Sequence, residues 1–199
     1  MRLIGTLTSP YARKARLVLL EKNIPHEFVN DLPQGEIARQ ANPMGRIPSL
    51  ILDDGFCVFD SSVIADYADA LNDNPVLIPR SDVKARLRVK RWEALADGIA
   101  DSAVVVRTER IRDVDRQDAA TLELHNRAIS NALDYAALLL GKNEWCEGKS
   151  ITLADLALAS ALVYLDLRQP ERDWRGAYPD LAAWFGKMSK RQSVIAASA

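Results

Sequence analysis

The residues best suited to chemistry lie near the amino terminus, where Ser9 and Pro10 separate a short apolar stretch from an amphipathic segment. Serine is a preferred N-cap, because its hydroxyl can accept a hydrogen bond from an unpaired backbone N–H of the first helical turn. Proline at the first helical position needs no N–H and already has a helical φ. This helix start therefore offers a hydroxyl, free N–H groups and a positive dipole end, which together predict a site for an anion.

Two carboxylate residues also lie near hydroxyl residues at the starts of predicted helices. Asp60 and Ser61 are capping residues that precede apolar residues at helical spacing. Thr152 and Asp155 form a capping box with Asp in the usual Glu position, ahead of a segment that is apolar on every side. A carboxylate there could suggest catalysis, yet capping is a sufficient task, so we interpret Asp155 as structural.

The elements that position these residues form a small α/β unit in the first half of the chain. Arg13, Lys14 and Arg16 fall mostly opposite the apolar residues of the first helix, so we expect them on the side away from the core. Asp53-Asp54-Gly55 is typical of a hairpin turn. The predicted order is a strand at 3–7, a helix at 10–22, a strand at 26–29, a short helix at 36–40, strands at 47–52 and 56–59, and a helix from 61.

The second half is predicted to consist of long helices. We expect Ser81 to cap the first of them and its basic residues, such as Arg86 and Arg91, to form a solvated face. A second helix should run from about 117 to 140, a buried central helix from about 152, and a last helix from Pro179. The apolar stripe of the first long helix is expected to comprise Val83, Leu87, Trp92, Leu95, Ile99, Ala103 and Val106.

Composition narrows the class of protein. The 199 residues are 48% hydrophobic and 27% charged, which is typical of a globular protein, and the net charge of −1 gives no reason to expect nucleic acid or an anionic membrane as a partner. Cys57 and Cys146 fit neither a disulfide framework nor a zinc site, so no metal is expected. We expect both to be small buried side chains in a reducing compartment. No signal peptide or membrane span is predicted, which makes the cytoplasm the expected location.

Four motifs in order along the chain resemble the glutathione S-transferase superfamily, and the similarity is greatest to bacterial members of unassigned substrate. The motifs are TSPYARKARLVLLE, NPMGRIPSL, FDSSVIADY and WCEGKSITLADL. The resemblance implies a thioredoxin-like glutathione-binding domain at 1–75, a linker at 76–81, and an all-helical domain at 82–199 with the second-substrate site. It also implies glutathione as co-substrate, a role in detoxification and a cytosolic homodimer.

The resemblance also assigns roles to individual residues. Ser9 matches the catalytic serine of some classes; the absence of a cysteine there counts against thiol-exchange chemistry. Ile47-Pro48 matches the family's cis-proline, where the Ile47 backbone pairs with the cysteinyl backbone of glutathione. Asp60 and Ser61 match the acidic-Ser pair that receives the γ-glutamyl end.

Several assignments have an alternative interpretation. Considered without the other motifs, Ser9 could be only an N-cap. Tyr11 is an alternative candidate for the catalytic hydroxyl, but we interpret it as a wall of the site. Asp101 matches an acidic residue that reaches across the dimer in some members, or is merely an exposed helical carboxylate. Arg107 and Arg110 either favour an anionic second substrate or lie in solvent.

These observations predict a glutathione transferase that activates the thiol of glutathione for attack on an electrophilic small molecule. The alternatives are a glutathione-dependent peroxidase or isomerase, and a non-catalytic glutathione-binding or protein-interaction scaffold. We expect the homodimer to form where the helix from Ser61 packs on the partner's helix from Ser81, with Tyr67, Trp92 and Arg91 as interface residues.

Overall fold

A computed structural model describes residues 1–198, and its amino-terminal part is built on a four-stranded sheet in the order β2-β1-β3-β4. β1 (Arg2–Gly5) runs parallel to β2 (Glu27–Asn30), as expected for strands joined by a crossover helix. β3 (Ser49–Ile51) pairs antiparallel with β1, and β4 (Cys57–Val58) pairs antiparallel with β3 across the predicted hairpin.

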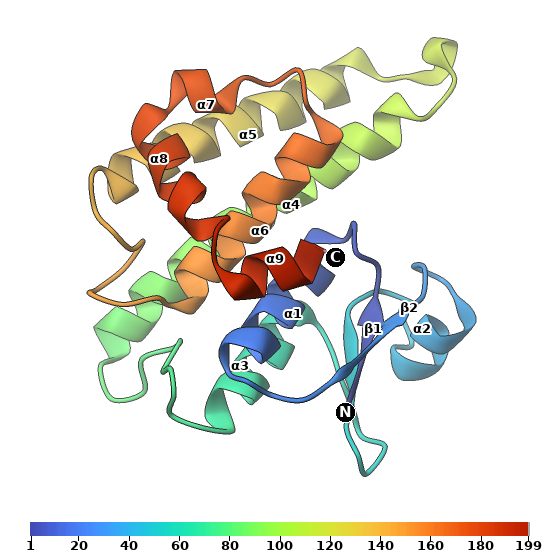
Figure 1. The fold of residues 1–199 in the computed structure, drawn as a ribbon. Coiled ribbons are helices and arrows are strands. Elements are labelled where there is room, and N and C mark those ends of the chain that lie inside the picture. The colour runs from blue at the N-terminus through green and yellow to red at the C-terminus, as the bar shows by residue number, and fades with distance from the viewer. Residues whose placement is uncertain (199) are drawn as a thin grey trace.

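Helices cover both faces of this sheet. α1 (Pro10–Glu21) and α3 (Ser61–Ala70) lie on one face, and α2 (Glu36–Ala41) lies on the other (Figure 1). Gly5 permits a close approach at the end of β1, because a Cβ there would stand 2.6 Å from the Cβ of Ala12. The start of α1 is thereby held tightly against the sheet.

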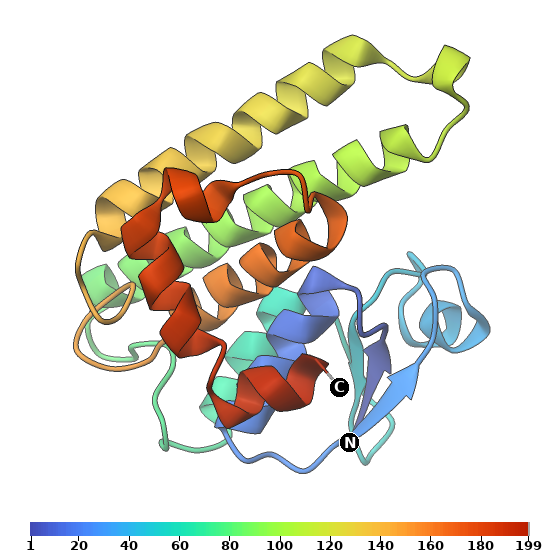
Figure 2. The ribbon, with the colours of Figure 1, turned by 45° about the horizontal axis from the view of Figure 1, so that its top comes forward.

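The carboxyl-terminal part is helical, and its two longest helices, α4 (Val83–Arg110) and α5 (Ala119–Leu140), form an antiparallel pair (Figure 2). The other helices are α6 (Leu153–Arg168), α7 (Trp174–Ala177), α8 (Pro179–Met188) and α9 (Gln192–Ser198), with a 3-10 turn at Val114–Arg116. α6 is the buried central helix that the sequence predicts, and it packs against α4 and α1. None of the helices in the described residues has the length and apolar character needed to span a membrane.

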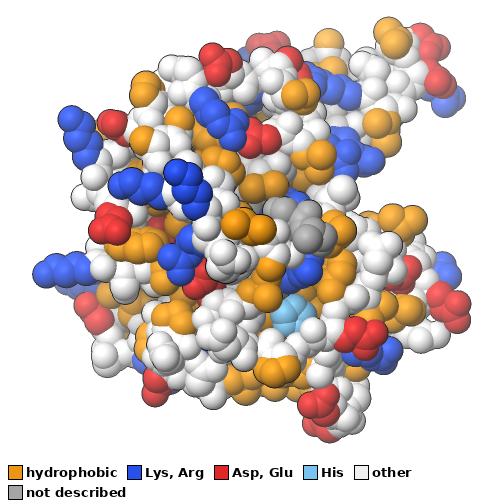
Figure 3. Space-filling model, viewed as in Figure 1, with side chains coloured by type: hydrophobic (Ala, Val, Ile, Leu, Met, Phe, Trp, Pro, Cys, Tyr) orange, Lys and Arg blue, Asp and Glu red, His pale blue; other side chains and the backbone are white. Residues whose placement is uncertain are grey.

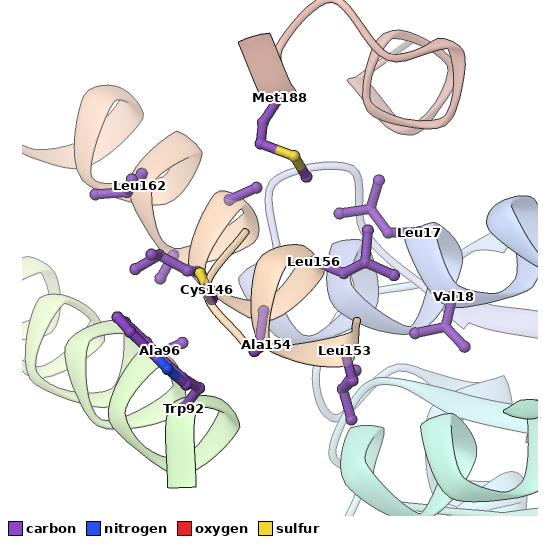
Figure 4. Close-up of a cluster of buried hydrophobic side chains, with 14 of the residues drawn as sticks. Leu17, Val18, Trp92, Ala96, Cys146, Leu153, Ala154, Leu156, Leu162 and Met188 are labelled. Atoms are coloured by element: carbon purple, nitrogen blue, oxygen red, sulfur yellow. The ribbon is translucent and has the colours of Figure 1, made fainter. Parts of the chain in front are cut away.

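One continuous core joins the two parts of the chain. Side chains of α1, α4, α6 and α8 meet in it, among them Leu17, Trp92, Leu156 and Met188 (Figure 4). Leu77 and Ile78 of the connecting segment are also buried, and their N–H groups donate to Asp69 of α3. The domain boundaries at 75 and 81 stay a prediction.

The expectation that the basic residues of α1 face away from the core was wrong for Arg13 and Lys14. Lys14 is 1% exposed, and its Nζ donates to Glu93 at 2.9 Å and to Asp97 at 2.7 Å. Arg13 is also buried and donates to the Leu7 carbonyl at 2.7 Å. α4 and α6 cover the side of α1 that the sheet leaves free, so carboxylates from α4 meet a face that periodicity assigned to solvent.

The start of α4 differs from its prediction in two ways. Asp82 caps the helix instead of Ser81, because its carboxylate accepts from the N–H groups of both Lys84 and Ala85. Val83 and Leu87 are exposed, since the core covers α4 only from Val89 onward. Trp92 lies inside that core and is therefore unavailable for an interface.

Two smaller predictions also needed correction. The helix from Pro179 is not the last, because α9 follows it and packs on α1. Arg191, just before α9, donates two hydrogen bonds to Glu21 at the end of α1. Both cysteines are free thiols, but Cys57 is only half-buried.

Candidate functional site

A cavity of about 860 Å³ lies between the sheet part and the helical part of the molecule. Figure 3 shows a hollow between these parts with Lys and Arg side chains on its upper rim. The start of α1, the loop before β3 and the start of α3 line one side, and the carboxyl-terminal halves of α4 and α6 line the other. Eight of the nine residues singled out from the sequence meet in it: Ser9, Tyr11, Ile47, Pro48, Asp60, Ser61, Asp101 and Arg107.

Ser9 caps α1 as predicted. Its Oγ accepts from the Ala12 N–H at 3.2 Å, and Pro10 follows as the first helical residue. No residue within 1–198 accepts the Ser9 hydroxyl proton, so this proton remains available to a molecule in the cavity. The turn that carries Ser9 is fixed from within the protein, because the buried Arg13 holds the Leu7 carbonyl.

Tyr11 has a different arrangement, because it already has an acceptor. Its hydroxyl donates to Asp101 of α4 in the same chain. Burial raises the pKa of Tyr11 well above its ordinary value, and the hydrogen bond and negative charge of Asp101 raise that pKa further. Tyr11 therefore keeps its proton at neutral pH and commits it to Asp101. The contact brings Asp101 into the cavity of its own chain.

The loop before β3 forms the second wall. The Ile47–Pro48 bond is cis, as the resemblance implied. Asn42 is buried beneath the loop, where its side chain donates to the Arg46 carbonyl at 3.3 Å and accepts from the Met44 N–H at 2.9 Å. These bonds fix the backbone that presents Ile47 to the cavity.

Asp60 and Ser61 form the third wall at the start of α3. Asp60 is the N-cap, and its Oδ1 accepts from the Ser62 N–H at 3.0 Å and from the Ser62 hydroxyl at 3.1 Å. Ser61 is buried in the first turn and borders the cavity. Capping occupies only one carboxylate oxygen of Asp60, so the same residues also fit a binding role.

Arginines on the cavity separate into those that the sequence suggested and those that it missed. Arg107 lines the cavity, but Arg110 does not: its guanidinium pairs with Glu171 outside the cavity. Of the two alternatives for Arg110, a position in solvent fits the structure, because its side chain is 41% exposed and pairs with Glu171 one turn beyond Arg107. Arg46 and Arg168 line the cavity and were missed, although Arg46 stands next to Ile47 in the recognised motif.

Asp155 lies outside the cavity and has the structural environment expected of a capping box. It is fully buried, and its Oδ2 accepts from the Thr152 N–H at 2.9 Å. Its Oδ1 accepts from the Cys146 N–H at 2.8 Å, which ties the loop before α6 to the helix start. Within residues 1–198, no group of three His, Cys, Asp or Glu side chains is arranged to hold a metal ion.

Comparison with known proteins gives matches over nearly the whole chain. Residues 3–76 match the model of the glutathione S-transferase N-terminal domain, and residues 119–187 match that of the C-terminal domain. The uncharacterized GST-like protein YibF of Escherichia coli (strain K12) is 35% identical, over 97% of this chain and 96% of that protein.

Solved structures of bacterial proteins match equally well. A glutathione S-transferase from Methylobacillus flagellatus KT with glutathione bound has a TM-score of 0.95 at 39% identity, covering 99% of this chain and 98% of that one. A glutathione transferase family member from Pseudomonas fluorescens Pf-5 with bound S-(propanoic acid)-glutathione has a TM-score of 0.88 at 33% identity, with coverage of 99% and 98%.

Proposed function

Because this chain belongs to the glutathione S-transferase family, we propose that it is a glutathione transferase that activates the thiol of glutathione for attack on an electrophilic small molecule. The observation that carries the proposal is the available Ser9 proton at the start of α1, in the same cavity as Ile47, Asp60 and Ser61. Glutathione and its derivative in the two bacterial relatives support the choice of ligand.

Glutathione would extend along the sheet side of the cavity. Its γ-glutamyl carboxylate would meet the Ser61 hydroxyl and the N–H groups at the start of α3, and its ammonium would meet Asp60. The cysteinyl backbone would pair with the Ile47 backbone, which directs the sulfur toward Ser9. Arg46, next to Ile47, is suited to the glycyl carboxylate, since an arginine side chain binds a carboxylate through two parallel hydrogen bonds.

Activation of the thiol rests on stabilising its charged form. A cysteine thiol has an ordinary pKa of about 8.5, so most of it is protonated at neutral pH. A decrease of about two units corresponds to roughly 2.7 kcal/mol of preferential stabilisation of the thiolate. A hydrogen bond from the Ser9 hydroxyl, together with the positive end of the α1 dipole, is of the right size to supply it. The thiolate would then attack an electrophilic carbon held against α4 and α6.

We further infer that the enzyme is a cytoplasmic homodimer that serves detoxification, with domains at 1–75 and 82–199. The free thiols of Cys57 and Cys146 support a reducing compartment. The family resemblance supports the assembly and the domain division.

Three measurements on the purified protein test the proposal. Calorimetric titration should detect glutathione binding, ultraviolet difference spectra should detect the bound thiolate, and a chlorodinitrobenzene should be conjugated. Binding without turnover of either a chloroarene or a hydroperoxide would favour the scaffold. Reduction of a hydroperoxide without conjugation would favour the peroxidase.

A further inference from the structure

The helical wall of the cavity has the same composition on both of its helices. On α4, Val104 and Val105 are followed by Arg107, and on α6, Tyr164 is followed one turn later by Arg168. Each helix thus contributes an apolar or aromatic surface and then a guanidinium toward its carboxyl-terminal end. A ligand on this wall meets an apolar floor with two positive charges beyond it.

Neither guanidinium is neutralised by the protein. Arg107 forms no ion pair within residues 1–198. Arg168 stacks over the Tyr164 ring at 5.6 Å, and its buried Nε has no hydrogen-bond partner. Two arginines outside the cavity wall differ in this respect: Arg110 pairs with Glu171, and Arg191 pairs with Glu21.

The acidic group on this wall does not compensate for the two charges. Asp101 lies on α4 before the valines, and it accepts the hydroxyl proton of Tyr11 instead of pairing with Arg107. A buried guanidinium N–H without a partner is unfavourable, and arginine is suited to binding a carboxylate through parallel hydrogen bonds. The wall therefore has an excess of positive charge that suits a carboxylate.

We propose that Arg107 and Arg168 bind the carboxylate of the second substrate, so that the enzyme selects small electrophiles with an apolar body and a carboxylate. This rests on the proposed function, because the electrophile must lie next to the glutathione sulfur. With a chloronitrobenzoate, the thiolate forms a carbon–sulfur bond at the ring carbon that carries chlorine. The carbon–chlorine bond breaks and chloride leaves with its electron pair, after the thiol proton has passed to solvent.

Two glutathione conjugates that differ only in charge test the site. One carries a nitrobenzoate on sulfur and the other the matching nitrobenzamide, which has the same shape but no charge. Calorimetry should show tighter binding of the carboxylate to the wild-type protein. Arg107→Gln and Arg168→Gln should each weaken binding of the carboxylate about tenfold to a hundredfold and leave the amide almost unchanged.

Arg110→Gln is the matched control, because it removes a guanidinium from the same helix outside the cavity. It should leave the preference for the carboxylate intact. Arg168→Lys retains the positive charge and should keep part of the preference, which separates loss of charge from loss of packing. If Arg168→Gln does not fold, Arg107→Gln and Arg168→Lys still provide the comparison.

The inference is overturned if the wild-type protein binds both conjugates equally, or if the preference survives both Gln substitutions. Binding of neither conjugate would overturn it together with the glutathione site. A different result would overturn the proposed function alone. In that case the protein would prefer the carboxylate conjugate and this preference would depend on the two arginines, but no chloroarene would be conjugated.

Discussion

Tyr11 of α1 donates its hydroxyl to Asp101 of α4, across an interval of 90 residues in the chain. The bond joins the sheet part to the helical part at the cavity. It also distinguishes the hydroxyl group of Tyr11 from that of Ser9. The proton of Tyr11 is committed, whereas that of Ser9 is available.

Tyr11→Phe should therefore leave the thiol pKa of bound glutathione close to its wild-type value. The substitution removes a hydroxyl that is already donating to Asp101, and it should cost about 0.5–1.5 kcal/mol of stability. Ultraviolet pH titration of the complex measures the thiol pKa, and urea unfolding measures the stability. Loss of the bound thiolate in Tyr11→Phe would assign the activation to Tyr11.

Ser9→Ala should raise the pKa of bound glutathione by about one to two units, because a hydrogen bond to a charged group contributes about 1.5–3 kcal/mol. Affinity for glutathione should decrease less, since Ile47, Asp60 and Ser61 hold the peptide independently. The same ultraviolet titration measures the thiol pKa, and calorimetric titration with glutathione measures the affinity. Ser9→Thr keeps a hydroxyl and an N-cap and should stay near the wild-type pKa.

An N-cap role alone would give a different result. Ser9→Ala would then lower the melting temperature while the bound thiol pKa stayed unchanged. In that case activation would belong to the backbone N–H groups of α1, and Ser9 would no longer be a catalytic candidate.

Asp155→Ala should destabilise the protein by at least about 2 kcal/mol without changing glutathione affinity. The substitution leaves the N–H groups of Thr152 and Cys146 without their acceptor in the interior, and each unsatisfied buried donor costs about 1–3 kcal/mol. Urea unfolding followed by tryptophan fluorescence measures the loss. A stable variant with impaired turnover would mean that Asp155 has a catalytic role.

The pair of Glu21 and Arg191 should make stability depend on pH in the acidic range. Burial by itself would raise the pKa of Glu21, but hydrogen bonds from Arg191 and Ser193 hold it below its ordinary value. A carboxyl whose pKa is lowered by folding stabilises the native state above its unfolded pKa of about 4.3, and this stabilisation is lost as the pH falls through the folded pKa.

The unfolding free energy of the wild type should therefore exceed that of Glu21→Gln at neutral pH, and the difference should shrink below about pH 4.3. Urea unfolding of both proteins over a pH series measures it. Glu123→Gln is the control, because Glu123 pairs with Arg127 on the exposed face of α5 and should show a much smaller pH-dependent difference. A difference for Glu21→Gln that does not change with pH would contradict the assignment.

The homodimer should depend on apolar side chains at the start of α4. Val83 and Leu87 are 78% and 67% exposed, and Arg86 holds this part of α4 beside α3 through Asp66 at 2.9 Å. Leu87→Glu places a charge in the proposed interface and should yield a monomer in light scattering. Leu124→Glu, on an exposed face of α5, should leave the assembly unchanged. A wild-type monomer at micromolar concentration would remove the proposal.

The sequence by itself determined the features that depend on neighbouring residues. The cap at Ser9, the hairpin turn at 53–55 and the capping box at Asp155 all formed as predicted, because their hydrogen bonds join residues within four positions of each other. The order of strands and helices followed for the same reason, since hydrophobic periodicity is a local signal. The resemblance added the cis bond before Pro48, which no local pattern requires.

Only the tertiary structure decided which side chains of distant helices meet. Lys14 appeared to lie on a solvent face until α4 covered it with Glu93 and Asp97. Arg107 and Arg110 are three residues apart on one helix, yet only Arg107 borders the cavity, and its companion Arg168 comes from α6. Periodicity in the sequence indicates which side chains share one face of a helix. What that face contacts depends on how whole helices pack against each other.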